Sequence, residues 1–141
     1  MNIDRFLKAQ ENCYADALSE LRNGRKRSHW IWFIFPQIAG LGRSPTARFY
    51  AIRDLDEARA YLNHPLLGAR LLECSQALLN IRGKTATEIL DPPDDMKLRS
   101  SMTLFAFIAG SDSVFACVLE RFFQGEPDRL TLEMILPQQA R

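Results

Sequence analysis

The fold of this chain depends on one apolar stretch, residues 28–36, which reads Ser28-His29-Trp30-Ile31-Trp32-Phe33-Ile34-Phe35-Pro36. Large apolar side chains favour burial, because burial removes apolar surface from water. A run of this length does not let periodicity distinguish a strand from a buried helix. Ser28 can cap a short helix that Pro36 ends, and no convincing partner strand lies elsewhere, so we favour a helix. We expect residues 30–35 to be largely buried against the first helix and the apolar face of residues 67–79.

Helical periodicity is clear on both sides of this stretch. Upstream, apolar residues recur at spacings of three and four from residue 3 to residue 21, and Asn23-Gly24 is a typical helix end. Downstream, His64-Pro65 begins a helix with an apolar face that extends to Leu79. Pro92-Pro93 leads into a further helix over about residues 94–109. Glycine and proline predict a loop over residues 37–45.

Capping residues mark the remaining helix starts. Their side-chain oxygens accept hydrogen bonds from the first N–H groups of a helix, and a glutamate three positions later completes a capping box. These starts are Asp54 (with Glu57) for residues 55–62, Thr85 (with Glu88) for a helix ending near Leu90, Ser111 or Ser113 for a helix to Phe123, and Asp128 for a helix ending before Pro137. The sequence predicts one domain over residues 1–141, all-α or nearly so, built as a compact array of about six to seven short helices.

Composition excludes several classes of protein. The 141 residues are 47% hydrophobic and 25% charged, as is typical of a globular domain. Eighteen basic and seventeen acidic side chains give a net charge of +1, which argues against a protein built to hold long nucleic acid. The N-terminus lacks a secretion signal, and no apolar run is long enough to cross a membrane. The three cysteines are far apart, so we expect reduced thiols, a cytoplasmic protein, and neither a metal site nor a cofactor.

Cationic, aromatic and glycine residues gather in residues 25–50, which makes this segment the first candidate for a binding site. Arginine binds phosphate or carboxylate through two parallel hydrogen bonds, and aromatic faces stack on bases or sugars. Gly40-Leu41-Gly42 lets backbone N–H groups approach an anion, although it lacks the rest of a dinucleotide or phosphate-loop motif. The alternative is that the aromatic residues belong to the core and the cations pair with nearby acids. The candidate ligand-binding residues are Arg27, Trp30, Gln37, Arg43, Ser44, Arg48 and Tyr50.

Residues 94–103 form the second candidate segment. Lys97 and Ser101 are four residues apart and share a helical face, but a Ser-x-x-Lys nucleophile has the opposite order. The alternative is structural, because acids at a helix start complement its dipole and small hydroxyls allow close packing. His29 is the better of the two histidines for acid–base chemistry, since an imidazole titrates near neutrality. The catalytic candidates are His29, Asp95, Lys97 and Ser101, and we expect one of the last three within hydrogen-bonding distance of residues 28–44.

The same two segments carry a resemblance to a known family. They read Lys26-Arg27-Ser28-His29-Trp30-Ile31-Trp32-Phe33-Ile34-Phe35-Pro36-Gln37, Gly40-Leu41-Gly42-Arg43-Ser44, and Asp95 through Lys97-Leu98 to Ser100-Ser101-Met102-Thr103-Leu104-Phe105. Together with Tyr61-Leu62 and His64-Pro65 they resemble the bacterial domain-of-unknown-function family 1810, over nearly the whole chain. Members of that family are often mislabelled calpastatin, which is a disordered inhibitor, whereas this chain has a core. The resemblance implies a small helical single domain and no established catalytic residues.

Two functional hypotheses follow. The first is a pocket that binds a phosphorylated or nucleotide-like small molecule, with or without catalysis. One version, suggested by a loose similarity in element order, is an N-glycosidase acting on ADP-ribose-type compounds. The second is a non-catalytic module that binds a protein partner through an exposed aromatic and arginine patch. Nucleic acid is a less favoured partner because the basic cluster is short. Polar signature residues converging on a concavity favour the pocket, and the same residues spread on a flat face favour the interface.

Overall fold

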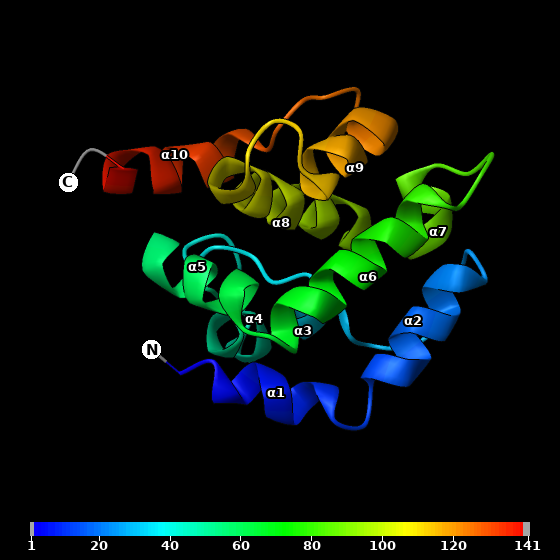
Figure 1. Cartoon of the computed structure of the whole chain (residues 1–141), viewed down its shortest axis with the longest axis horizontal. Helices are drawn as coiled ribbons and strands as arrows, with labels where there is room; N and C mark the ends of the chain where they lie inside the picture. Colours follow the sequence, from blue (N-terminus) through cyan, green and yellow to red (C-terminus); the bar gives the residue numbers. More distant parts are fainter. Residues whose placement is uncertain (1, 140–141) are drawn as a thin grey trace.

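The computed structural model describes residues 2–139, and this part of the chain folds into ten α-helices without a β-strand (Figure 1). The predicted helical class is therefore confirmed, but the expected number of six to seven helices is wrong. The helices are α1 (Asp4–Gln10), α2 (Tyr14–Arg22), α3 (Ile31–Ile34), α4 (Pro45–Phe49), α5 (Leu55–Asn63), α6 (Leu67–Leu79), α7 (Ala86–Leu90), α8 (Asp94–Ala109), α9 (Val114–Phe123) and α10 (Arg129–Gln139).

The predicted first helix is divided into α1 and α2 by a turn at residues 11–13. Gln10, at the end of α1, is buried, and its amide donates to the Phe33 carbonyl at 2.8 Å and to the Tyr61 hydroxyl at 3.0 Å. Tyr14, at the start of α2, lies under the Arg70 guanidinium, 4.5 Å from its ring centroid. Contacts with α3, α5 and α6 thus fix each side of the turn and override the local helical periodicity.

The helix α4 was not predicted and follows the loop of residues 37–44. The Ser44 hydroxyl accepts a hydrogen bond from the Ala47 N–H at 3.1 Å, and Pro45 occupies the first helical position, where it needs no N–H partner. The preceding loop is held by an isolated parallel bridge between Ile38 and Ile52, which contributes the one ladder-like contact in residues 2–139. The Ser-Pro pair was the available signal for this helix.

Capping chemistry placed the other helices correctly, with one error at the C-terminal end. Thr85 and Glu88 form both bonds of a capping box at α7, and Ser113 caps α9. The helix α10 continues through Pro137, where we expected it to end. The Gln138 side chain holds this last turn in place, because its amide donates to the Met134 carbonyl at 3.2 Å and its carbonyl accepts from the Leu55 N–H at 2.8 Å. A proline near the end of a helix removes a single backbone bond, which these contacts offset.

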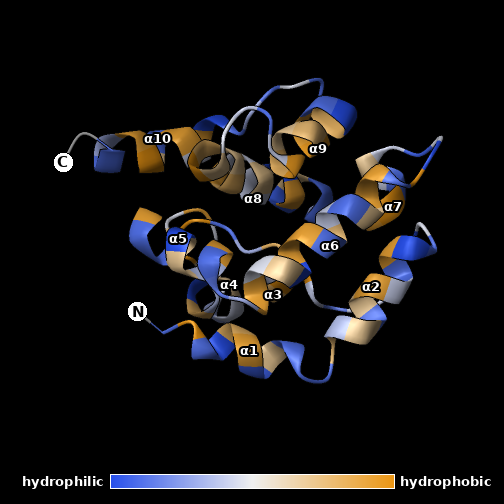
Figure 2. Ribbon diagram, viewed as in Figure 1, coloured by the Kyte–Doolittle hydropathy of each residue, from blue (hydrophilic) through white to orange (hydrophobic). Residues whose placement is uncertain are grey.

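The helices α6 and α8 form the centre of the array (Figure 1). The helix α8 packs against α5, α7, α9 and α10, while α6 packs against α2, α5 and α9. The short helix α3, whose four residues are all apolar, contacts α1, α6 and α8, and Figure 2 shows hydrophobic residues on the neighbouring α6. The predicted packing of residues 30–35 against the first helix and α6 is therefore confirmed, and the run is helical as expected.

Trp32 is the exception within this run. Trp30 is 1% exposed and Phe35 is fully buried, and the other members are buried too, whereas Trp32 remains partly exposed. The run is largely buried, as expected, and only the assignment of Trp32 to the core is wrong. A four-residue helix crossing the interior cannot turn every side chain inward, and α3 leaves the Trp32 ring at the surface between residues 26–29 and α8.

The carboxylate of Glu20 fixes the start of the apolar run. One oxygen accepts from the backbone N–H groups of Arg27 (2.7 Å) and Ser28 (3.0 Å) and from the Trp30 indole N–H (2.9 Å). The other oxygen accepts from the Ser28 hydroxyl at 2.6 Å. Burial alone would raise the pKa of Glu20, but these hydrogen bonds outweigh it and lower the pKa to about 2. The carboxylate therefore stays ionised and holds residues 27–30 against α2.

The two tryptophans allow a matched test of this packing. We expect Trp30→Ala to lower the free energy of unfolding by about 3–5 kcal/mol, as for other large core truncations. Trp32→Ala removes the same indole from a site that is already partly in water, so we expect a loss of roughly 1–2 kcal/mol. Urea denaturation of both variants measures the difference. Equal losses would show that Trp32 contributes to the core as much as Trp30 does.

A second test concerns the pH dependence of stability. Because the folded-state pKa of Glu20 lies below the ordinary value of 4.5, its carboxylate stabilises the fold above about pH 4.5 and this contribution disappears as the pH falls towards 2. We expect Glu20→Gln to cost about 1–2 kcal/mol at neutral pH, a value reduced for solvent screening, and progressively less in acid. Glu11→Gln, at an exposed position in the turn after α1, is the control. A cost that is independent of pH would contradict the role of the charge.

Candidate functional site

A cleft of about 360 Å³ opens where the segment before α3 meets the start of α8. One side is formed by Lys26, Arg27, His29 and Trp32, and the other by residues 90–94 and Lys97. We call it the Lys26–Lys97 cleft. It combines part of the first sequence segment with part of the second, so the fold brings the two signature regions together.

Two lysines share one carboxylate inside the cleft. The Lys26 ammonium lies 2.8 Å from a carboxylate oxygen of Asp94, and the Lys97 ammonium lies 3.6 Å from the other oxygen. All three side chains are largely withdrawn from solvent, with exposed fractions of 8% for Lys26, 16% for Asp94 and 23% for Lys97. Each ammonium also lies over a tryptophan ring, Lys26 at 5.2 Å from Trp30 and Lys97 at 5.0 Å from Trp32. These cation–π contacts hold the lysines extended along the cleft.

Backbone contacts with α7 hold the cationic side of the cleft in place. The Lys26 N–H donates to the Ile89 carbonyl at 2.8 Å, and the Arg25 guanidinium donates to the Glu88 carbonyl at 2.9 Å. Arg25 also forms an ion pair of 2.6 Å with Asp91, which lowers the pKa of that carboxyl. Asp91 has a left-handed backbone (φ 65°), a conformation that costs energy for a residue other than glycine. The loop between α7 and α8 is thus fixed by contacts from the segment opposite it.

The four catalytic candidates separate into two pairs. His29 and Lys97 both line the cleft, and His29 is exposed. Asp95 is turned away, because its carboxylate accepts from the Thr87 hydroxyl at 2.7 Å and from the Met96 N–H at 2.8 Å. Ser101 is fully buried, and its hydroxyl has no hydrogen-bond partner among residues 2–139. The four residues therefore do not form one cluster.

The expected hydrogen bond between the two segments is not formed. Within residues 2–139, contact instead runs through the Lys26–Asp94 ion pair and through Lys97 over Trp32. Two polar side chains of α8 have partners close by in sequence: Asp95 accepts from the Thr87 hydroxyl, and the Ser100 hydroxyl donates to the Met96 carbonyl. A buried polar group needs a partner, and a local one satisfies it without a distant segment.

The ligand-binding candidates are spread over four places. Arg27 lines the cleft, while Trp30 is buried with its N–H on Glu20, which leaves no ring face open to a ligand. Gln37 and Tyr50 line a smaller hollow that also touches Trp32. The remaining three, Arg43, Ser44 and Arg48, are exposed on or beside α4, and Ser44 serves as its cap.

Sequence reasoning missed several residues of the cleft. Trp32 was assigned to the core, Lys26 was counted only within a basic cluster, and Asp94 was explained by the helix dipole. Their proximity arises from the packing of α3 against α8, which periodicity does not predict. The Asp91-Pro92-Pro93-Asp94 run, between the capped helix α7 and the start of α8, was the available signal for this loop.

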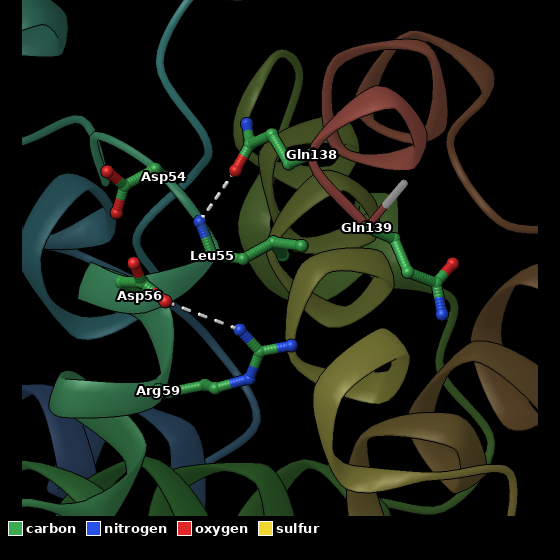
Figure 3. A pocket seen from close by; sticks show the side chains of 6 residues that line it. All are labelled: Asp54, Leu55, Asp56, Arg59, Gln138 and Gln139. Carbon is green, nitrogen blue, oxygen red and sulfur yellow. Dashed lines mark hydrogen bonds and ion pairs between the residues drawn. The ribbon is translucent and has the colours of Figure 1, made fainter. Parts of the chain in front are cut away.

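A second hollow of similar size, about 350 Å³, lies between the start of α5 and the end of α10 (Figure 3). Three of its polar side chains, Asp54, Asp56 and Gln138, are engaged in local contacts. Asp54 caps α5, Asp56 forms a 3.6 Å ion pair with Arg59, and Gln138 accepts from the Leu55 N–H. These contacts serve packing, and we do not assign a site there.

Residues 2–139 hold no group of three or more His, Cys, Asp or Glu side chains placed to bind a metal ion. Within the same range, every helix is too short or too polar to span a membrane.

Comparisons with known proteins agree with the fold and leave the function open. The chain matches a solved structure described as the conserved hypothetical protein Rv1873 from Mycobacterium tuberculosis, with 47% sequence identity and a TM-score of 0.93. The match covers 95% of this chain and 96% of that one. No curated protein matches. A family model described as a protein of unknown function, DUF1810, matches residues 1–135, and the chain therefore belongs to the DUF1810 family.

Proposed function

We propose that this protein binds a small phosphate-bearing molecule in the Lys26–Lys97 cleft. One observation carries the proposal: three cationic side chains, Lys26, Arg27 and Lys97, line a concavity that contains only two carboxylates. A volume of about 360 Å³ lies within the range of small-molecule sites. Low-dielectric walls strengthen the field of the unbalanced charge, and an anion entering the cleft would neutralise it.

Arg27 and Lys97 are the cations best placed to meet such an anion. No ion pair links Arg27 to an acidic side chain within residues 2–139, while its backbone is fixed by Glu20. Lys97 lies farther from Asp94 than Lys26 does, at 3.6 Å against 2.8 Å. A guanidinium offers two parallel hydrogen-bond donors to a phosphate. An ammonium on a flexible side chain can move to contact the same phosphate.

His29 gives the cleft a group for proton transfer. It is the one imidazole in the lining, and an imidazole can donate a proton from one ring nitrogen and accept one at the other. A reaction on the bound molecule would use His29 as acid or base and Lys97 to stabilise developing negative charge.

A second candidate function, protein binding, is favoured by the surface of α4. Phe49 is 57% exposed, and Arg43 and Arg48 are exposed beside it. Exposed aromatic and arginine side chains are enriched at protein interfaces. This surface lines no part of the cleft, so the two functions can be tested separately.

Binding of ribose 5-phosphate, with ribose as the uncharged control, tests the first proposal. We expect a dissociation constant in the millimolar range or below, weakening as salt rises because exposed charges are screened. Arg27→Ala should weaken binding about tenfold, the usual scale for a lost charge-assisted hydrogen bond. Isothermal titration calorimetry gives the affinities, and amide chemical shifts in NMR spectra should move in residues 26–32 and 90–97.

Arg48→Ala is the matched control, because it removes the same charge from α4 and should leave the affinity unchanged. If Arg48→Ala weakens binding as much as Arg27→Ala does, the effect is one of overall charge and the cleft is not the site. No binding of ribose 5-phosphate or inorganic phosphate by the folded protein at low salt would contradict the proposal and favour the protein-binding function of α4.

A further inference from the structure

We infer that the molecule held in the Lys26–Lys97 cleft carries a flat aromatic ring next to its phosphate and that Trp32 stacks on this ring. The inference rests on the proposed function and narrows it from phosphate-bearing molecules in general to nucleotides. Three features of the cleft carry it: the exposure of Trp32, the freedom of its indole, and the apolar part of the lining.

Trp32 is the one member of the apolar run that the fold leaves partly in water. Its neighbours Ile31 and Phe33 are 1% and 8% exposed. Exposed indole surface forgoes hydrophobic stabilisation that each of its neighbours gains. The fold thus places a large aromatic ring in the wall of a charged cleft, where a second flat ring can cover it.

The indole N–H groups of the two tryptophans differ sharply. Trp30 donates to Glu20 at 2.9 Å, which pins its ring in the core. The Trp32 N–H is buried and has no partner within residues 2–139, although buried indole N–H groups usually have one. No hydrogen bond therefore fixes the Trp32 ring. It borders the small hollow of Gln37 and Tyr50 as well as the cleft, and the cleft is the side on which a ligand could contact it.

The rest of the lining suits a flat apolar group. Leu90, Pro92 and Pro93 add carbon surface to the same cleft, whereas the cations lie at Lys26, Arg27 and Lys97. A site with an aromatic wall, apolar neighbours and adjacent cations matches a ligand with a ring at one end and phosphate at the other. A sugar phosphate would satisfy the cations and leave the apolar surface uncovered.

Lys97 connects the two halves of such a ligand. Its ammonium lies 5.0 Å from the Trp32 ring centroid and only 3.6 Å from Asp94, at 23% exposure. A stacking base would take the place over the ring that the ammonium now occupies. The flexible lysine stem lets the charge move a short distance to the phosphate, where it gains a stronger partner than the ring.

The experiment compares AMP with ribose 5-phosphate, which share sugar and phosphate and differ in the base. We expect the unaltered protein to bind AMP about tenfold more tightly, as base–aromatic stacking predicts. Trp32→Leu should lower the affinity for AMP to that for ribose 5-phosphate. The affinity for ribose 5-phosphate should stay within about twofold of its value in the unaltered protein. Arg27→Ala should weaken both ligands by the same factor and preserve their ratio.

Acrylamide quenching of tryptophan fluorescence adds a test on the unaltered protein, should Trp32→Leu fail to fold. Since Trp30 is buried, the quenchable emission comes from Trp32. AMP should protect it from acrylamide, and ribose 5-phosphate should not.

The inference is overturned if the two ligands bind equally well, if Trp32→Leu weakens both by the same factor, or if saturating AMP leaves the quenching unchanged. In each case ribose 5-phosphate still binds and the proposed phosphate site stands. If neither ligand binds, the proposed function itself has failed, and the stacking inference fails with it.

Discussion

The rest of this structure depends on the hydrogen bonds that the Glu20 carboxylate accepts. By accepting hydrogen bonds from two backbone N–H groups, a hydroxyl and an indole, it fixes residues 27–30 at the end of α2. That attachment places Trp30 in the core and sets the register in which α3 crosses the interior. With Trp30 facing inward, Arg27, His29 and Trp32 are left along the edge that faces α8. The hydrogen bonds to this one carboxylate therefore determine both how the apolar run packs in the core and which side chains line the cleft.

Features governed by neighbours in the sequence were predictable, and features governed by distant contacts were not. The hydrogen bonds of the capping box formed by Thr85 and Glu88 lie within four residues, so α7 could be predicted from the sequence. The break between α1 and α2 depends on Gln10 reaching Phe33 and Tyr61, across more than twenty positions. Local propensity carries no record of such contacts. The division of the first helix was missed for this reason, whereas α4 was missed although its Ser-Pro signal is local. The helical class was right.

The candidate site follows the same division. Arg27, His29 and Lys97 were identified because charge and imidazole chemistry can be recognised in single residues. Trp32 was not, since its six-residue run reads as uniformly apolar and only the geometry of α3 separates a ring in the core from a ring at the surface. Asp95 and Ser101 were overestimated, because side-chain type does not reveal that Asp95 is satisfied by Thr87 within eight residues. Chemical type predicts what a residue can do, and packing decides where it does so.

The charges in the cleft are not arranged as stability alone would favour. A buried ion pair of one lysine and one aspartate is already costly, because desolvation offsets much of the attraction. Here a second lysine, 23% exposed, shares the same carboxylate, and Arg27 adds an unpaired charge at the edge. An apolar residue in place of Lys97 would cover Trp32 without this cost. Sites that bind a ligand commonly carry such local destabilisation, because the ligand supplies the missing partner. The excess cation beside a partly exposed indole is the arrangement that the proposed ligand would complete, whereas in the hollow between α5 and α10 Asp54, Asp56 and Gln138 already pair with groups of the fold.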